Sequence, residues 1–260
     1  MDWQERSRRL AGPEKIIKLE KSHVLLFGLG GVGSFAAEAL ARSGVGKLSL
    51  VEYDRIIDSN RNRQLPALVG TVGQNKIDVC AARLKEINPE LELVLYPFKM
   101  TAENLPSILA AGRPDFIADA IDDLAAKVRL IITAKDEGIP IISSMGAGYR
   151  LDPSQLAIGD ISQTHTCPLA RRLRRSLKEE GLTEGLPVVW SKENPLPDHD
   201  RLQDGAQGSG QAGAAEAAVE MAGEAPETAE APKGRKGPAS MIFVPASAGL
   251  LMASYIIRNI

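Results

Sequence analysis

Cysteines and aromatic residues are scarce in this sequence, and their scarcity excludes several kinds of site. Only two cysteines, Cys80 and Cys167, occur in 260 residues. They cannot form a disulfide framework or a four-cysteine zinc site, and so few cysteines are typical of a reducing compartment. Aromatic residues make up 4% of the chain, too few for a platform that stacks single-stranded bases. The formal net charge is −2, so any contact with nucleic acid must come from a local basic patch.

The sequence also lacks a long uninterrupted apolar run. The N-terminal segment MDWQERSRRLAG has no apolar centre of the kind found in signal peptides. Residues 241–257, MIFVPASAGLLMASYII, are the one membrane candidate, but Pro245 and small polar residues interrupt them. A membrane span needs about 20 apolar residues. We therefore expect residues 241–257 to form a buried helix and the protein to be cytoplasmic, with no membrane span.

Large apolar residues are almost absent between Gln203 and Pro238, where only Val219 and Met221 occur. Such a segment cannot bury enough apolar surface to offset the entropy lost on ordering. We predict a low-complexity, disordered insertion over residues 194–238. It separates a main domain, residues 1–193, from residues 239–260, which we expect to complete the same domain.

Strand and helix patterns alternate through the main domain. Buried or alternating apolar runs predict strands, and periodic runs predict helices between them. The predicted strands are 23–28, 47–52, 90–98, 115–121 and 139–145, and the predicted helices are 34–44, 74–87, 104–112 and 124–138. Further along we expect extended connections over 151–165, a helix starting at Pro168 and a strand over 185–190. This order predicts an α/β fold with a Rossmann-like, doubly wound, mostly parallel sheet, whose ligand lies at the carboxyl edge of the strands.

A glycine-rich turn joins the first predicted strand to the first predicted helix. Such a turn places backbone N–H groups and a helix N-terminus against phosphate oxygens. Glu52 ends the next strand, where these folds place an acid on a ribose hydroxyl. Asp54 follows it, and its role stays open between nucleotide binding and capping of the next loop. The glycines of the turn are Gly28, Gly30, Gly31 and Gly33.

Cations next to this turn favour ATP over a nicotinamide dinucleotide. Asn60, Arg63 and Gln64 form a polar cluster, for which the alternative is a solvated loop. Arg63 can bind phosphate oxygens through two parallel N–H groups. Lys76 starts a helix, where an isolated cation opposes the helix dipole unless an anionic ligand lies there. Together these cations suit a triphosphate with roughly four negative charges and a departing pyrophosphate.

Two carboxylates follow the strand at 115–121. Asp122 is placed to hold Mg²⁺ against phosphate oxygens, since Mg²⁺ prefers oxygen ligands. Asp123 is placed to cap the N-terminus of the next helix. The alternative to a metal site is N-capping of this helix by Asp123 alone, and both can hold at once.

The remaining candidates are basic residues and the two cysteines. Arg6 precedes the first strand and either belongs to an exposed basic leader or reaches a triphosphate, in this subunit or a partner. Cys80 has an apolar helical position typical of a core. Cys167 lies at a helix N-terminus, which makes it the candidate nucleophile. One helix is strongly cationic and is either a solvated face or a surface for a phosphate backbone; its cations are Arg171, Arg172, Arg174, Arg175 and Lys178.

These motifs resemble the ubiquitin-activating-enzyme-like (ThiF/MoeB/HesA) superfamily, whose members adenylate carboxylates with Mg-ATP. The motifs are GLGGVGS, the acidic strand end followed by SNRNRQ, the Gly-x-x-Lys helix start and the IDD strand end. Within the superfamily, ISSMGAG, DISQTHTCPLA, the basic helix, GLPVVWS and SMIFVPASAGLLMAS resemble the tRNA threonylcarbamoyladenosine dehydratases. The resemblance covers residues 1–193 and 239–260.

The resemblance implies an activity and a role for each motif residue. ATP would adenylate the carboxylate of a threonylcarbamoyl group on a tRNA adenosine beside the anticodon. An internal nucleophile would then expel AMP, closing a ring with net loss of water. Glu52 would hold the ribose, Arg63 and Lys76 the phosphates, and Asp122 the magnesium. Arg6 would cross the interface of a homodimer, and a sulfur-transfer protein is a further possible partner.

The sequence departs from this branch at particular positions, and two other functions remain open. Glu52 replaces the usual aspartate, and Cys167 stands where the branch has aspartate before Pro-Leu-Ala. Some relatives carry a cysteine after the basic helix, and GLPVVWS has none, which favours direct cyclisation over a thioester. The alternatives are adenylation of a small sulfur-carrier protein, and a non-catalytic nucleotide-binding scaffold.

Overall fold

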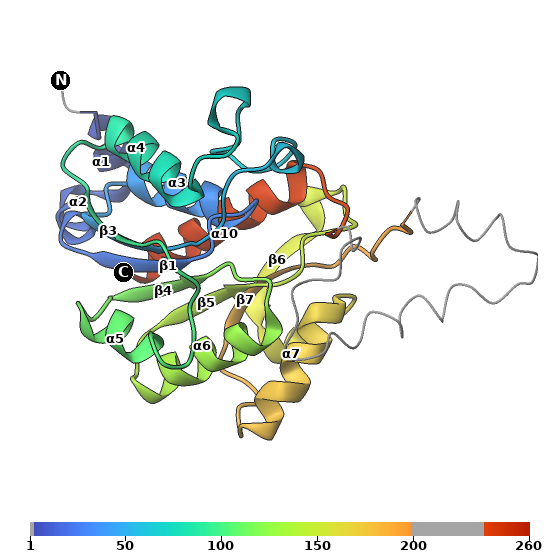
Figure 1. Cartoon of the computed structure of the whole chain (residues 1–260). Coiled ribbons are helices and arrows are strands. Elements are labelled where there is room, and N and C mark those ends of the chain that lie inside the picture. The colour runs from blue at the N-terminus through green and yellow to red at the C-terminus, as the bar shows by residue number, and fades with distance from the viewer. Residues whose placement is uncertain (1–2, 199–236) are drawn as a thin grey trace, which may run out of the picture.

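A computed structural model of the protein describes residues 3–198 and 237–260, in which helices and strands alternate (Figure 1). The elements in chain order are α1 (Glu5–Ala11), α2 (Pro13–Glu20), β1 (His23–Phe27), α3 (Gly33–Arg42), β2 (Lys47–Val51), α4 (Lys76–Ile87), β3 (Glu92–Tyr96), α5 (Leu105–Ala110), β4 (Phe116–Asp119), α6 (Leu124–Asp136), β5 (Ile141–Ser144), β6 (Leu156–Asp160), α7 (Pro168–Glu179), β7 (Pro187–Ser191) and α10 (Phe243–Asn259). Short 3-10 helices lie at Asp58–Asn60, Val69–Thr71, Pro153–Gln155 and Ile161–Gln163.

The strands form one seven-stranded sheet in the order β3-β2-β1-β4-β5-β7-β6. All neighbouring strands are parallel except β6, which runs antiparallel to β7. The strand order reverses between β1 and β4, and doubly wound sheets bind their ligands in the crevice outside the carboxyl ends at that point. The predicted Rossmann-like, mostly parallel α/β fold is therefore confirmed.

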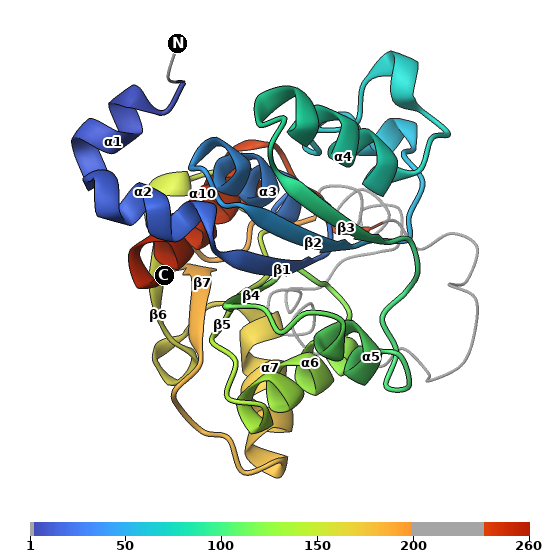
Figure 2. The same cartoon turned by 90° about the vertical axis from the view of Figure 1, so that its left-hand side faces the viewer.

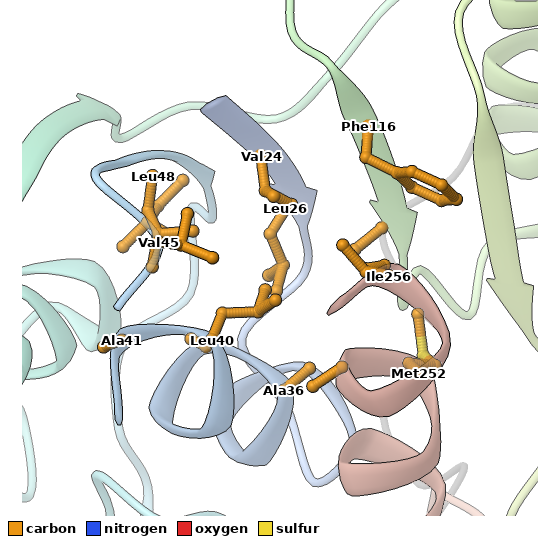
Figure 3. Close-up of a cluster of buried hydrophobic side chains, with 14 of the residues drawn as sticks. Val24, Leu26, Ala36, Leu40, Ala41, Val45, Leu48, Phe116, Met252 and Ile256 are labelled. Atoms are coloured by element: carbon orange, nitrogen blue, oxygen red, sulfur yellow. The ribbon is translucent and has the colours of Figure 1, made fainter. Parts of the chain in front are cut away.

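Both faces of the sheet are covered by helices, as the apolar strands require. Figures 1 and 2 show α3 and α10 on one face and α5, α6 and α7 on the other. Strand β1 sends Leu26 to the first face and Phe27 to the second, so it packs against both layers. Figure 3 shows the first layer, where Leu26 lies beside Leu40 of α3, with Met252 and Ile256 of α10 next to it.

The C-terminal helix α10 lies deep in this first layer, as predicted for residues 241–257. Its contact with α3 is close, since a Cβ at Gly249 would lie 2.3 Å from the carbonyl oxygen of Val32. Among the described residues, no helix has the length and apolar character needed to cross a membrane. Most of the predicted insertion, residues 199–236, lies outside the described residues.

Two segments are more regular than the sequence indicated. The basic leader forms α1 and α2, and Ile16 and Leu19 of α2 are buried in the first layer. The extended connections predicted over 151–165 contain β6, which pairs with β7 along its whole length. The residues of β6 are only half-buried, so their apolar pattern is weak and its partner strand, distant in sequence, determines the pairing.

Candidate active site

A pocket of about 610 Å³ opens at the carboxyl edge of the sheet. It lies outside the ends of β1, β2, β4 and β5, across the point where the strand order reverses. Its volume is within the range of roughly 300–1,000 Å³ that is usual for small-molecule sites. The position is the one predicted from the alternation of strands and helices.

The glycine turn forms one wall, and its glycines have two different roles. Gly30 and Gly31 line the pocket, as does Gly28. Gly28 has a φ of 86°, and a Cβ there would lie 2.8 Å from the carbonyl oxygen of Ala120. Gly33 does not line the pocket, and its Cβ would lie 1.8 Å from the carbonyl oxygen of Gly28. Gly33 thus allows α3 to pack directly on the turn and Gly28 allows the turn to pack against Ala120, while Gly30 and Gly31 leave backbone open to a ligand.

Glu52, Asp54 and Lys76 form a charge cluster beside the glycine turn, in which Glu52 and Lys76 are buried and Asp54 is exposed. Lys76 is 2% exposed, and its Nζ lies 3.4 Å from Glu52 Oε2 and 3.0 Å from Asp54 Oδ2. The other contacts of Glu52 are to backbone: its Oε2 accepts from the N–H of Leu29, and its Oε1 from those of Tyr53 and Asp54. The carboxylate therefore ties the end of β2 to the glycine turn.

The interpretation of Lys76 as an isolated cation is wrong. Two carboxylates balance its charge, and the N–H of Lys76 also donates to the carbonyl of Asp54 at 3.0 Å. An isolated bridge between Arg55 and Asn75 joins the same two segments. This pairing could not be predicted from local sequence patterns, because the loop of residues 55–75 separates Lys76 from Glu52 and Asp54. Lys76 does line the pocket, with Glu52 and Asp54.

Arg63 and Gln64 line the pocket, whereas Asn60 does not. Arg63 is half-buried, and its Nη1 donates to the carbonyl of Ser59 and to Asn62 Oδ1. Gln64 is buried, and its Oε1 has no hydrogen-bond partner among the described residues. A buried acceptor without a partner is costly, so Gln64 is a candidate to receive a donor from a ligand. The Asn60 Oδ1 accepts from the N–H of Ile57 and shapes the turn.

The ends of β4 and α6 supply an acidic wall. Asp123 caps α6, since its Oδ1 accepts from the N–H of Ala126 at 2.9 Å, which confirms the predicted cap. Asp122 is exposed and lines the pocket. Burial, followed by the charges of Asp54 and Asp122, raises the pKa of Tyr53 above its ordinary value. Within residues 3–198 and 237–260, no cluster of three or more His, Cys, Asp or Glu side chains could hold a metal alone.

A buried ion pair lies beneath the pocket, and sequence analysis missed it. Asp119 and Lys127 are both 0% exposed, and Lys127 Nζ lies 2.7 Å from Asp119 Oδ2. The hydroxyl of Ser143 donates to the same oxygen at 2.6 Å, and Lys127 also donates to the carbonyl of Ser144 at 3.0 Å. The pair thereby fixes the ends of β4 and β5 relative to each other. The sequence feature that could have indicated this pair is the position of Lys127 on the apolar face of α6, which it shares with Leu130 and Ile131.

Arg150 is a second buried cation that sequence analysis missed. It is 4% exposed and lines the pocket on the side of β5 and α7. Its guanidinium donates to the carbonyls of Gly146, Gly148 and Glu193 at 2.9–3.3 Å, with a longer contact of 3.5 Å to Thr166. It therefore joins two loops and the segment after β7.

The two cysteines have different surroundings. Cys80 is buried in α4, and burial raises its pKa to about 12, so its predicted place in the core is confirmed. Cys167 is buried at the N-terminus of α7 and lines the pocket. Its Sγ accepts from the N–H of Ala170 at 3.5 Å, so the sulfur acts as the N-cap of α7.

The remaining basic candidates lie outside the pocket. Arg6 is exposed on α1, away from the pocket of its own chain. Arg174 of α7 donates to Thr164, at 2.8 Å to its carbonyl, so part of its role is to fix the loop before α7. Arg175 lies 3.6 Å from Glu179. The exposed cations of α7 are Arg171, Arg172, Arg175 and Lys178.

The doubly wound sheet, the glycine turn and the charged pocket at the strand reversal define a Rossmann-like α/β protein with a site for a phosphorylated ligand. The model of the ThiF family matches residues 4–260, so the chain belongs to the ThiF family.

Within this family, the chain is similar to tRNA threonylcarbamoyladenosine dehydratases of two organisms. The chain is 38% identical over 255 residues to a tRNA threonylcarbamoyladenosine dehydratase of Bacillus subtilis, covering 98% of this chain and 93% of that protein. It is 40% identical over 192 residues to tRNA threonylcarbamoyladenosine dehydratase 2 of Saccharomyces cerevisiae, covering 74% of this chain and 43% of that protein.

Solved structures of the Escherichia coli tRNA N6-threonylcarbamoyladenosine dehydratase are similar along the whole chain. The complex with AMP has a TM-score of 0.81 at 28% identity, covering 100% of this chain and 95% of that chain. The complex with ATP has a TM-score of 0.79 at 28% identity, with the same coverage.

Proposed function

We propose that this protein is an ATP-dependent tRNA threonylcarbamoyladenosine dehydratase. The observation that carries the proposal is the likeness to the Bacillus subtilis enzyme over 98% of the chain, which extends beyond the nucleotide motifs to both sides of the pocket. A sulfur carrier protein adenylyltransferase of Thermus thermophilus matches only 56% of the chain. That shorter match supports nucleotide chemistry alone. Adenylation of a sulfur carrier is therefore the alternative function that the experiment below must distinguish.

In this proposal the glycine turn and the neighbouring cations bind ATP. Gly28, Gly30 and Gly31 present backbone to the phosphates, and Glu52 accepts hydrogen bonds from the ribose hydroxyls. Lys76 and Arg63 stabilise the charge that develops as pyrophosphate leaves. Lys76 is suited to this task because its carboxylate partners hold the ammonium group at the pocket wall before ATP arrives.

Magnesium is the metal that this chemistry implies, and the residues of the pocket fit it. Mg²⁺ is commonly held by one or two carboxylates together with phosphate oxygens and waters. Asp122, exposed at the end of β4, supplies such a carboxylate. When bound, the ion would neutralise charge on the phosphates.

The reaction has two covalent steps. An oxygen of the threonylcarbamoyl carboxylate attacks the α-phosphorus of ATP, the bond to the β-phosphate breaks, and pyrophosphate leaves. An internal nucleophile of the same group then attacks the activated carbonyl carbon and expels AMP. The cyclic product therefore differs from the starting threonylcarbamoyl group by the loss of one water molecule. The protein contributes chiefly position and charge stabilisation.

The tRNA is proposed to lie on the exposed cations of α7, next to the pocket. The N-terminus of α7 lines the pocket through Cys167, Pro168 and Leu169, so a backbone on this helix can deliver a nucleotide to the site. A homodimer would bring Arg6 of a second copy to the triphosphate. We also propose a cytoplasmic location, where the tRNA substrate is found, and leave a sulfur-transfer protein as a possible partner.

The decisive experiment combines a gene deletion with purified components. Mass spectrometry of anticodon-loop nucleosides should show the open threonylcarbamoyl form accumulating in the deletion strain, and the cyclic form returning with the wild-type gene. Purified protein should release AMP and pyrophosphate with modified tRNA, and neither with unmodified tRNA. AMP release with a sulfur carrier alone would replace this function by the alternative. ATP binding without AMP release would indicate a scaffold.

A further inference from the structure

The pocket has two halves with different electrostatics. The nucleotide half is formed by the glycine turn and by the ends of β2 and β4. The acceptor half is formed by residues 144–150 after β5 and residues 167–169 at the start of α7, with Pro195, Pro238 and Ser240. The nucleotide half contains the acids Glu52, Asp54, Asp122 and Asp123, whereas no Asp or Glu lines the acceptor half among the described residues.

Arg150 places a buried positive charge in the acceptor half. Four cationic side chains of the described residues line the pocket, and of these only Lys76 and Arg150 are buried. Lys76 has two carboxylate partners, whereas Arg150 takes part in no ion pair formed by the described residues. Its contacts are all backbone carbonyls. A buried charge without a counter-charge is costly, which makes this guanidinium a site for an anion.

The geometry of Arg150 leaves capacity for a ligand. A guanidinium has five N–H donors, and Arg150 makes four contacts, the Nη2 contact to Thr166 being long at 3.5 Å. One N–H therefore has no acceptor among the described residues, and Nη2 is the nitrogen with the weakest present contact. A carboxylate that approaches this nitrogen gains a charge-assisted hydrogen bond.

Backbone strain on both sides of Arg150 supports a built site. Tyr149 and Thr166 are the two non-glycine residues with positive φ in the described chain, at 58° and 61°. The Tyr149 N–H donates to the carbonyl of Ala239, and the Thr166 hydroxyl donates to the carbonyl of Ser191. Such conformations are costly and persist where the surroundings fix them, often at ligand sites.

We propose that Arg150 binds the carboxylate of the acceptor and thereby brings it to ATP. This inference rests on the proposed function and deepens it, because it assigns the residue that recognises the reacting group. A carboxylate that approaches a triphosphate is repelled by roughly four negative charges, and the repulsion is strong in a pocket that excludes water. A fixed guanidinium on the acceptor side offsets that repulsion and orients the attacking oxygen.

The test compares two RNAs that differ only in that carboxylate. One is an anticodon stem-loop with threonylcarbamoyladenosine, and the other carries its methyl ester. Their dissociation constants are measured by calorimetry for the full-length protein with a non-hydrolysable ATP analogue. The variant is Arg150→Gln, and the matched control is Arg113→Gln, which removes an exposed arginine that also donates to a backbone carbonyl.

The wild type and Arg113→Gln should bind the acid at least tenfold more tightly than the ester, and Arg150→Gln should bind both equally. A preference that survives in Arg150→Gln, with both affinities reduced alike, would make Arg150 merely structural and overturn the inference. Absence of a preference in the wild type would overturn it as well. If Arg150→Gln lacks a cooperative thermal transition, Arg150→Lys replaces it and should lose part of the preference, whereas an unchanged ratio would count against the proposal.

The wild type also separates this inference from the proposed function. If the wild type neither binds the acid stem-loop nor releases AMP with it, the proposed function falls, and the inference falls with it. If the wild type turns over the stem-loop but Arg150→Gln keeps the acid preference, only the inference falls.

Discussion

The nucleotide half and the acceptor half of the pocket are built by different means. In the nucleotide half, the buried cation Lys76 is paired with the carboxylates of Glu52 and Asp54 before any ligand is present. In the acceptor half, Arg150 is held by backbone carbonyls alone, between two residues with positive φ. A paired cation stays stable without its ligand, whereas an unpaired one is stabilised when an anion arrives. In the proposed function, the first half would hold ATP and the second the particular carboxylate that ATP activates.

The largest expected effect is on stability, and it comes from breaking the buried ion pair of Asp119 and Lys127, which lies beneath both halves of the pocket. Lys127→Met leaves Asp119 buried without its cation, which should lower the free energy of unfolding by about 3–5 kcal/mol. Denaturant unfolding monitored by circular dichroism measures this change. Lys135→Met, an exposed lysine of the same helix, is the control. A loss below about 1 kcal/mol would show that β4 and β5 do not depend on the pair.

The next largest effect should fall on the nucleotide half. Lys76→Ala and Arg63→Ala should each reduce AMP formation at least a hundredfold, about 3 kcal/mol for a lost electrostatic donor. Lys85→Ala, an exposed lysine of the same helix, should leave the rate unchanged. Thermal unfolding of each variant separates lost chemistry from lost folding. Near-normal turnover in either variant would refute the role assigned to that residue.

A smaller effect should follow from removing the exposed charges beside the acceptor half. The triple variant Arg171→Ala, Arg175→Ala, Lys178→Ala should bind tRNA about tenfold more weakly and with a shallower salt dependence, because each lost phosphate contact lowers the slope by about 0.7–0.9. Filter binding over a range of salt concentrations measures both quantities. Replacing Lys15 and Lys18 of α2, together with Lys21 directly after it, is the control. Equal losses in the two triple variants would mean that α7 has no special role.

Cys167 tests whether the acceptor half contains a nucleophile. Cys167→Ser should retain AMP formation and cyclisation within about twofold, and its thermal midpoint should stay the same or rise because serine is a favoured N-cap. Rates and the thermal midpoint are measured on the same preparation. Complete inactivity in a folded Cys167→Ser protein would instead indicate a thiol mechanism.

The smallest effect should come from His23, at the end of the sheet opposite both halves. Burial, with a smaller contribution from Lys47, lowers the pKa of His23 below 6.5. Between that lowered pKa and 6.5 the unfolded chain binds more protons than the folded chain, so the free energy of unfolding increases with pH across this window. On acidification through this window, the wild type should lose more stability than His23→Gln, measured by thermal unfolding. Identical pH dependence of the two proteins would show that His23 does not contribute.

The features that could be predicted from the sequence are those encoded locally. The glycine turn, the Asp123 cap and the start of α7 at Pro168 each depend on a few consecutive residues, and the fold follows from their alternation with apolar strands. Cys80 was recognisable because its helical spacing matches its apolar neighbours.

What could not be predicted depends on residues that are distant in sequence. Lys127 and Arg150 are chemically indistinguishable from surface cations until the fold buries them against Asp119 and against backbone carbonyls. The pairing of Lys76 with Glu52 requires the loop of residues 55–75 to return to the end of β2. Strand β6 has a weak pattern because an edge strand needs few buried residues.

The position of α10 has a consequence for the order in which the molecule assembles. This helix packs against α3 and against the part of the sheet formed by β5, β7 and β6, yet every strand of the sheet precedes it in the chain. During synthesis, the apolar surface that receives Met252 and Ile256 is therefore complete before its cover emerges. Newly made chains expose that surface until Gly249 reaches α3, and this interval is when they are most prone to aggregation and to capture by chaperones.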